Sequence, residues 1–422
     1  MNIIITTKKI IFLLLGIFLL SSMLSAQWST PVEVSGGEPK LFIAGESFII
    51  DNAGKIHVVY KNWTDGVPDI WYANNISGSW SKSKIMSGDS PIITYNHLSN
   101  TLAITYNSGT SQGANNIIEK PAVGGSWSSA VRIDQNPSSG YLVDSAVDLS
   151  GGLLHSWGHL FDDSWNPRSG AYSRYRPYMG SFEATQLIAG SSGDTWIGPG
   201  GAIGMKAFEN DIYVYYKTNA LNGARYKVRS NGVWGAEKLI DSKGYGCHMA
   251  KSPTTGELAA VWGRGSDYPQ SDLDWDIYAS FSNDGGNTWS TPIVIYDNRE
   301  LTRSPSAHYD SKGNFHVVFQ SRDWNWEKFK TRYVYRVGAL WQPMQQIDTV
   351  GTGSNPTKKA FGELGGNLYL FYGEESKIKY RTKPIGTDNT PPASVINLSA
   401  TGGENRIFLN WTNPSDSDYA AT

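Results

Sequence analysis

The chain has 422 residues, of which 40% are hydrophobic, 13% aromatic and 18% charged, with 45 Gly and a single Cys. This composition excludes a disordered chain, a coiled coil and a small disulfide-rich protein. The formal net charge of −2 does not favour nucleic acid or an anionic membrane as the main partner. Few charges together with many Trp, Tyr and Gly residues are typical of short strands joined by tight turns, so we expect an all-β protein.

The N-terminus carries the pattern of a secretory signal peptide. Lys8 and Lys9 precede an apolar run from Ile10 to Leu20, and small residues follow up to Ala26. The run is too short to span a bilayer, and no later segment is long and apolar enough to do so. We therefore expect residues 1–26 to be removed and the mature protein to be secreted, outside the cell or at its surface, without membrane insertion.

An aromatic residue recurs ahead of an apolar residue in seven units of the chain. The repeated residues are Trp28, Trp80, Trp127, Phe182, Trp234, Trp289 and Trp341. A turn and an alternating strand precede each later one, as at 256–262, whereas the last such strand, at 366–372, has no Trp segment after it. The segment that begins at Gln27 supplies the missing partner, because its sequence QWSTPVEV matches WSTPIVI at 289–295.

This arrangement predicts a seven-bladed β-propeller over residues 27–384. A ring of sheets leaves two exposed strand edges unless the start of the chain pairs with the last blade. We expect the N-terminal strand Trp28–Val34 to close the last blade, which contains Leu368–Phe371. Equivalent strands are spaced by roughly 45 to 60 residues, which suits a four-stranded blade with its loops. A β-sandwich is the alternative, but it does not account for the match between the two ends.

A separate module is expected after the propeller. Residues 385–392 are polar and contain Pro, which is typical of a linker. The segments Val395–Ala400 and Ile407–Trp411, with Asn413-Pro414 after them, resemble the start of a fibronectin type III domain. The resemblance implies a β-sandwich of roughly 100 residues, of which residues 393–422 would be an incomplete part. Such modules are usually spacers or adhesion units.

Residues Ser282–Trp289, with the sequence SNDGGNTW, fit the pattern Ser-x-Asp-x-Gly-x-Thr-Trp. Its Asp accepts hydrogen bonds, its Gly supplies unusual backbone angles and its Trp packs between sheets. Through this Asp-box, or BNR repeat, the chain resembles the sialidase-like propeller superfamily. The motif stabilises a hairpin on the face opposite the ligand-binding loops, so the resemblance implies a superfamily and no particular reaction.

Two features depart from the sialidases themselves. The resemblance implies three arginines that bind a substrate carboxylate, the first of them near the start of the propeller, whereas the first arginine of this chain is Arg132. Sialidases are also six-bladed, and this chain has seven units. Both departures weaken a sialidase activity as the interpretation.

Side chains suited to sugars gather in the long loops of the fifth and sixth units. Aromatic faces stack on sugar rings, and Arg and Asp hydrogen-bond hydroxyl groups or pair with acidic sugars. The residues predicted to bind a glycan are Arg264, Tyr268, Trp275, Arg303, Arg322, Trp324 and Trp326. The alternative is that they form packed corners and solvated charge pairs.

Inner strands line the channel of a propeller, and one of them contains Tyr245 and His248. Near an arginine, Tyr or His can remove and return protons in an elimination from a uronate sugar. The chain is loosely similar in architecture to seven-bladed polysaccharide lyases, including ulvan lyases, which use that combination. The predicted catalytic residues are Tyr245 and His248 for proton transfer, with Asp267 or Asp323 as the acid. Alternatively, His248 is a hydrogen-bonded residue that fills the channel.

The leading hypothesis is therefore recognition of an extracellular glycan or polysaccharide, with acidic sugars included. The second is catalysis on the same ligands, as a lyase or a sialidase-like glycosidase, and the third is a purely structural or adhesion role. We expect a monomer with no cofactor and no metal site, because the sequence contains no phosphate-binding loop and no zinc-spaced His/Cys set.

Overall fold

The computed structural model describes residues 28–35, 47–64, 67–108, 114–134, 140–161, 167–189, 204–216, 223–265, 275–297, 301–322, 329–348, 355–374, 377–386, 396–403 and 406–412. The regular elements of these residues are all β-strands. The described residues include no helix that is long and apolar enough to cross a membrane. The chain forms two compact units, Thr30–Arg381 and the two chain ends.

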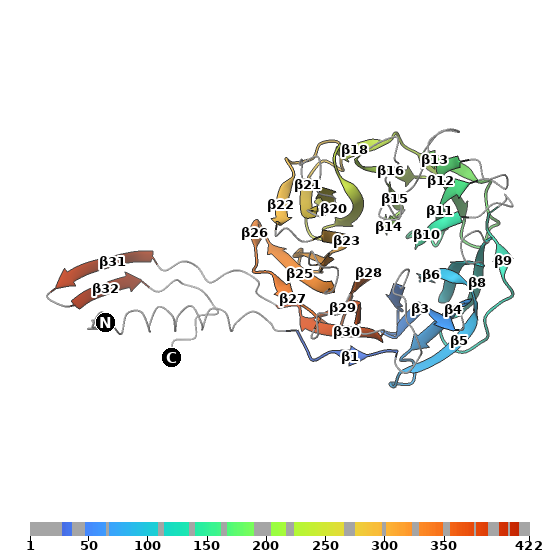
Figure 1. The fold of residues 1–422 in the computed structure, drawn as a ribbon, viewed down its shortest axis with the longest axis horizontal. Helices are drawn as coiled ribbons and strands as arrows, with labels where there is room; N and C mark the ends of the chain where they lie inside the picture. The colour runs from blue at the N-terminus through green and yellow to red at the C-terminus, as the bar shows by residue number, and fades with distance from the viewer. Residues whose placement is uncertain are drawn as a thin grey trace. The chain divides into compact units, whose positions relative to one another are not determined.

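The larger unit is a ring of seven blades, which follow one another in chain order (Figure 1). Blade 1 contains β2 (Ser47–Ile50), β3 (Ile56–Thr64), β4 (Val67–Asn74) and β5 (Ser81–Ser87). Blade 2 contains β6 (Asp89–Asn96), β7 (Thr101–Asn107), β8 (Asn115–Pro121) and β9 (Val131–Arg132). Blade 3 contains β10 (Gly140–Val147), β11 (Leu153–Phe161), β12 (Pro167–Arg176) and β13 (Gln186–Ala189). Blade 4 contains β14 (Gly204–Phe208), β15 (Asp211–Tyr216), β16 (Ala224–Ser230), β17 (Val233–Trp234) and β18 (Lys238–Asp241).

The remaining three blades complete the ring. Blade 5 contains β19 (Tyr245–Lys251), β20 (Leu258–Gly265), β21 (Trp275–Ser282) and β22 (Ile293–Tyr296). Blade 6 contains β23 (Leu301–Tyr309), β24 (Phe315–Arg322), β25 (Phe329–Val337), β26 (Leu340–Trp341) and β27 (Gln345–Gln346). Blade 7 contains β28 (Asn355–Leu364), β29 (Asn367–Glu374) and β30 (Lys377–Pro384), and β1 (Val32–Glu33) pairs with β30. The predicted all-β, seven-bladed fold is confirmed.

The second strand of each blade is apolar because both of its faces are buried. In β20, Leu258 and Trp262 pack in a cluster with residues of blade 4. Ala259 and Val261, which alternate with them, pack in a cluster with residues of blade 6. Successive side chains of a strand point to opposite faces, so a strand between two neighbouring sheets needs apolar residues at every position.

The repeated Trp residues join neighbouring blades, and in blade 5 the Trp stands ahead of the outer strand. Trp289 lies ahead of β22, which begins at Ile293. The Trp289 ring meets the ring of Tyr226 in blade 4 edge-on, with centroids 6.0 Å apart. Trp127 of blade 2 meets Tyr72 of blade 1 in the same way, at 5.4 Å. Large rings that fill the gap between twisted sheets explain why the aromatic residue recurs once per blade.

The strand β1 lies antiparallel to β30, with Val32 opposite Tyr380 (Figure 1). The Val34 amide donates to the Ile378 carbonyl at 2.8 Å, and the Ile378 amide donates to Ser35 Oγ at 2.8 Å. Val34 is 5% exposed and belongs to the apolar cluster between blades 7 and 1. Residues from the start of the larger unit therefore occupy the outer edge of its last blade.

The second unit contains the antiparallel strands β31 (Ile396–Gly403) and β32 (Arg406–Thr412). Their register places Ala400 opposite Leu409. Asn413-Pro414 of the predicted fibronectin-like module, residues 387–392 of the predicted linker 385–392 and the predicted signal peptide lie outside the described residues.

The turn Ser282–Trp289 is organised by the carboxylate of Asp284. Asp284 Oδ1 accepts from the backbone amides of Asn287 and Thr288, both at 2.9 Å, and Oδ2 accepts from the Thr288 hydroxyl at 2.6 Å. The Thr288 hydroxyl and amide and the Ser282 hydroxyl lower the pKa of Asp284. The Gly286 carbonyl accepts from the Tyr226 hydroxyl of blade 4 at 2.9 Å, so this turn fastens blade 5 to its neighbour.

Two adjacent glycines of this turn offer a matched test of that contact. Gly285 and Gly286 both have positive φ, at 69° and 81°. An added methyl group would meet nothing at Gly285, whereas at Gly286 it would collide with the Tyr226 hydroxyl. We expect Gly285→Ala to cost about 1 kcal/mol of unfolding free energy through its backbone angle, and Gly286→Ala to cost about 3 kcal/mol because the collision adds to it. Chemical denaturation measures both, and equal losses would contradict the interblade contact.

Candidate functional site

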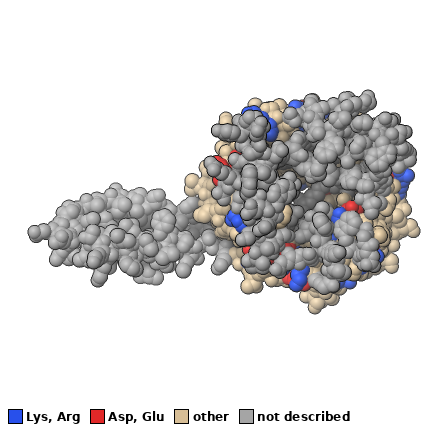
Figure 2. Space-filling view, in the orientation of Figure 1, with Lys and Arg blue, Asp and Glu red and all other residues tan. Residues whose placement is uncertain are grey.

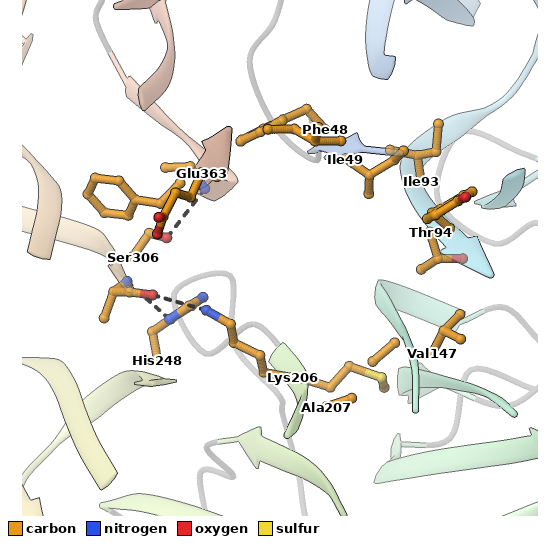
Figure 3. A pocket seen from close by; sticks show the side chains of 18 residues that line it. Phe48, Ile49, Ile93, Thr94, Val147, Lys206, Ala207, His248, Ser306 and Glu363 are labelled. Carbon is orange, nitrogen blue, oxygen red and sulfur yellow. Dashed lines mark hydrogen bonds between the residues drawn. The ribbon is translucent and has the colours of Figure 1, made fainter. Parts of the chain in front are cut away.

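A cavity of about 430 Å³ lies at the centre of the ring (Figure 3). Residues from the first strands of all seven blades line it. Ala146 and Val147 stand at the end of β10, and Ile93–Tyr95 stand in the second half of β6. The cavity therefore occupies the part of the channel nearer to the turns between first and second strands. We call the opposite end, where second strands finish at residues such as Arg264 and Arg322, the loop end.

Polar side chains of the first strands hold neighbouring blades together around this cavity. Each accepts a hydrogen bond from a backbone amide of the next first strand. The pairs are Ser47 Oγ with Ile93 (2.7 Å), Asp144 Oδ2 with Met205 (2.8 Å), His248 Nδ1 with Ala307 (3.1 Å) and Ser306 Oγ with Ala360 (3.4 Å). Figure 3 shows the last two among the cavity-lining residues. These bonds fix the spacing of strands that run side by side around the channel.

His248 lines the cavity and is 9% exposed. Its Nδ1 atom accepts a hydrogen bond from the Ala307 amide. The centre of its ring lies 5.3 Å from the centre of the Tyr215 ring. The imidazole thus joins blade 5 to blade 6, as the hydrogen-bonded alternative predicts. A role of His248 in proton transfer stays a prediction.

The cavity contains one ammonium group and one carboxylate among the described residues that line it, Lys206 and Glu363. Lys206 Nζ donates to the Ala307 carbonyl at 3.3 Å, which links blade 4 to blade 6. Glu363 Oε2 accepts from the Ser311 amide at 2.8 Å. The charges of this cavity are therefore engaged with the backbone of neighbouring blades.

His308 lies beside this cavity and is held in its neutral form. Burial lowers the pKa of His308 well below the usual value. Lys206 and His316 lower this pKa further, whereas Asp310 raises it. The His308 ring stacks on Phe361, with centroids 6.1 Å apart. A neutral, stacked imidazole is suited to packing, and protonation would place an additional cation next to Lys206.

At the loop end, Arg264 belongs to a cluster of aromatic and acidic side chains. Its side chain is 20% exposed, and Nη1 lies 3.8 Å from Asp241 Oδ2. Asp241 Oδ2 also accepts from the Trp262 indole at 2.9 Å. The Arg264 guanidinium lies 5.1 Å from the centre of the Tyr278 ring. These contacts hold the guanidinium in place at the end of β20.

Arg322 has a similar aromatic partner in the next blade. Arg322 is 4% exposed, and its guanidinium lies 5.3 Å from the centre of the Phe329 ring. Arg322 pairs with Leu301 in the register of β23 and β24, and Leu301 forms a parallel bridge with Trp275. Blades 5 and 6 are thereby joined into one sheet at this end.

The register separates the two arginines by three strand steps, from β20 through β21 and β23 to β24. Strands in a sheet are about 4.8 Å apart, so the two backbones lie roughly 14 Å apart. Each guanidinium is also held against its own ring, Tyr278 or Phe329. Arg264 and Arg322 therefore lie against two different aromatic rings.

The structure places Tyr245, Trp275 and Arg303 through their backbone. Tyr245 begins β19 opposite Gly263, Trp275 begins β21, and Arg303 lies in β23 opposite Gln320. Together with Arg264 and Arg322 they stand at the loop end of blades 5 and 6, whereas His248 lies deeper in the channel. The remaining predicted site residues, Asp267, Tyr268, Asp323, Trp324 and Trp326, lie outside the described residues.

The sequence reasoning missed Lys206 and Glu363 of the central cavity. Both lie in first strands, β14 and β28, which carry no recurring motif. The sequence does contain a signal for them. Both lie in the strand just before an alternating second strand, and that first strand runs along the channel. Among the described residues of this face, Figure 2 shows basic and acidic residues singly or side by side.

Within the described ranges, no three His, Cys, Asp or Glu side chains gather in a way that would hold a metal ion. The free Cys247 is buried, and burial raises the pKa of its thiol. A buried thiol of this kind behaves as a small apolar residue.

No protein-family model matches the chain, and no curated protein sequence matches it. Solved structures do share its fold. The polysaccharide lyase Uly1 aligns with a TM-score of 0.52 at 8% identity, over 81% of this chain and 90% of that one. The Penicillium chrysogenum alpha-L-arabinanase complexed with arabinobiose aligns with a TM-score of 0.47 at 10% identity, over 85% and 99%. The intramolecular trans-sialidase from Ruminococcus gnavus aligns with a TM-score of 0.45 at 12% identity, over 82% and 94%. At these identities the comparisons bear on the fold alone.

Proposed function

We propose that the chain is a carbohydrate-active propeller that binds an acidic glycan at the loop end of blades 5 and 6. The observation that carries this proposal is the pair of guanidinium groups held on aromatic rings there, Arg264 on Tyr278 and Arg322 on Phe329. A planar guanidinium binds carboxylates and hydroxyl groups through parallel hydrogen bonds, and aromatic rings next to it stack on sugars. The fold shared with a polysaccharide lyase supports the same class of ligand.

The separation of the arginines favours a polymer over a single acidic sugar. Two binding groups whose backbones are roughly 14 Å apart suit successive acidic residues of one chain. The ligand class that follows is a uronate polysaccharide, with a sialylated glycan as the competing probe. The predicted residues Tyr268, Trp324 and Trp326 belong to this proposed surface as stacking platforms.

Catalysis on the same ligand is the second candidate. Tyr245 and Arg303 occupy the first strands of adjoining blades at the loop end. In an elimination, an arginine neutralises the uronate carboxylate, and a tyrosine oxygen takes the proton from the carbon next to it and returns one to the leaving oxygen. Tyr245 is the proposed proton-transfer group, and His248, Asp267 and Asp323 remain the other proposed catalytic residues.

We also infer the wider organisation of the protein. Its leader favours secretion, and the N-terminal strand on blade 7 is proposed to close the ring of a monomeric propeller. The bonding of Asp284 in the turn Ser282–Trp289 supports kinship with Asp-box propellers. The segment from 393 is proposed to begin a fibronectin type III module.

Glutamine substitutions of the two arginines test the binding surface. We expect Arg264→Gln and Arg322→Gln each to weaken binding of polygalacturonate about tenfold, because each removes a charge-assisted hydrogen bond. The matched control is Arg336→Gln: Arg336 lies 3.6 Å from the Phe281 ring centre, near the opposite end of blade 6, and its loss is expected to leave binding unchanged. Calorimetric titration measures the affinities, and absorbance of unsaturated products reports cleavage.

Three results would contradict this proposal. They are no binding of polygalacturonate by the unaltered protein, equal binding by all variants, and a loss in Arg336→Gln as large as in the other two. Binding without unsaturated products would support recognition and exclude the lyase candidate for this polymer.

A further inference from the structure

The first strands of five blades share an irregularity at the loop end. In blades 2, 3, 5, 6 and 7 the register shifts, and the residue before the shift pairs with the residue that follows a buried aromatic residue of the second strand. In blade 7 the residue before the shift is Pro356, opposite Tyr372. In the other four blades it is Asp89, Tyr141, Tyr245 or Arg303, opposite Asn107, Gly158, Gly263 and Gln320. The buried aromatic residues of these four blades are Tyr106, Trp157, Trp262 and Phe319.

This common register places the four residues at one level of the channel. A β-bulge re-aims the side chain beside it, and bulges are frequent next to active sites. Two of the four, Tyr245 and Arg303, are already candidates for the proposed function. Asp89 and Tyr141 occupy the same position in the blades that precede them around the ring. Equivalent positions in four blades thus supply one acid, two tyrosines and one arginine.

Asp89 forms an ion pair at this level. Its Oδ1 accepts from Lys61 Nζ at 2.7 Å, and the two side chains are 15% and 9% exposed. Lys61 follows the buried Tyr60 in β3, which is the equivalent place in the second strand of blade 1. A largely buried ion pair contributes little net stability against the desolvation of both groups, so fold stability alone is a weak reason for it.

The backbone around Asp89 is constrained. Ser90 has a φ of 50°, and its amide donates to Asp89 Oδ1 at 2.5 Å. Among non-glycine residues of the described ranges with positive φ, Ser90 alone lies within a strand. At Gly88 an added Cβ would stand 2.8 Å from side-chain atoms of Ile70 and Tyr106, so this segment fits tightly between two blades. Strained residues held by tight packing are a feature of sites that pre-organise a functional group.

We propose that Asp89 contacts the ligand at the loop end and accepts hydrogen bonds from sugar hydroxyl groups. This rests on the proposed glycan-binding function. Tyr141, Tyr245 and Arg303 hold the equivalent backbone positions of their blades. A carboxylate has only acceptor oxygens and a guanidinium has only donors, so the two together fit a sugar that carries hydroxyl groups and an acidic group. The Lys61 ammonium binds Asp89 Oδ1, which leaves Oδ2 for the ligand.

The test compares Asp89→Asn and the double variant K61M/D89N with the unaltered protein. The double variant removes both charges of the ion pair, and thermal unfolding checks that it is folded. The probes are polygalacturonate, 3′-sialyllactose and arabinobiose. The matched control is Glu209→Gln, which removes a carboxylate paired with Lys251 at 3.4 Å in the turn after β14, at the other end of the channel.

We expect both Asp89 variants to bind the recognised probe about tenfold more weakly, and Glu209→Gln to bind it normally. Normal binding by K61M/D89N would overturn this inference and leave the proposed function intact. This holds even if Asp89→Asn alone binds weakly, because the loss would then come from the Lys61 charge that Asp89 no longer balances. A loss as large in Glu209→Gln would overturn it as well. Failure of the unaltered protein to bind any probe would overturn both.

Discussion

Replacing Val34 by Asp is expected to lower the unfolding free energy of the propeller by about 3 to 4 kcal/mol. Val34 is 5% exposed in the cluster between blades 7 and 1, and a carboxylate at this position would lose its water without gaining a partner. The strand edge of blade 7 would then lose its partner, because the Val34 amide bonds to Ile378. Chemical denaturation measures the loss, and size-exclusion chromatography reports association through the exposed edge.

Val32 provides the matched control in the same segment. It is 37% exposed and also pairs with β30, so Val32→Asp changes the same charge at an accessible position. We expect Val32→Asp to cost less than about 0.5 kcal/mol. Equal stability of the two variants would show that this segment does not close the ring.

Acidification from about pH 7.5 to 5.5 is expected to destabilise the folded protein by up to about 1.4 kcal/mol per pH unit for each buried neutral histidine. His57 and His308 have lowered pKa values, chiefly because of burial. Asp51 opposes the shift of His57, and Lys206 and His316 add to that of His308. Below the unfolded pKa of 6.5, the unfolded chain binds protons that the folded chain does not, so stability falls as the pH falls.

His308→Phe isolates one of these contributions. The Nε2 atom of His308 makes no hydrogen bond with the residues that the structure describes, and its ring stacks on Phe361, so a phenyl ring suits the position. The unfolding free energy of His308→Phe should fall less steeply between about pH 6.5 and 5.5 than that of the unaltered protein. The two slopes should differ by the equivalent of up to one proton bound on unfolding. A slope unaltered by His308→Phe would assign the pH dependence to other groups.

A related pattern in two blades shows how far residue spacing leads. The segments beginning at Asp51 and Asp310 share the order Asp, Gly, His, Val, Val. In the structure both segments form buried hydrogen-bonded side-chain networks. His57 Nε2 lies 3.2 Å from Asp51 Oδ2, and His316 Nε2 lies 3.1 Å from Asp310 Oδ2. The other nitrogens meet the hydroxyl groups of Tyr72 and Tyr333 in the third strands. Spacing reveals the repeated Asp and His, but the tyrosines come from strands whose pairing the sequence does not state.

The sequence by itself determined the all-β class and the count of seven blades, because one strand with two buried faces and one interblade aromatic residue recur in every unit. It also marked the loop end of blades 5 and 6 as rich in Arg and aromatic residues. Only the tertiary structure decided that Arg264 and Arg322 stand apart on separate rings and that His248 accepts a backbone amide from the next blade. It alone aligned Asp89 with Tyr245 and Arg303. The physical reason is that the repeat acts through local burial, whereas the partners of a side chain depend on strand register, which is set when each sheet packs against its neighbours in the ring.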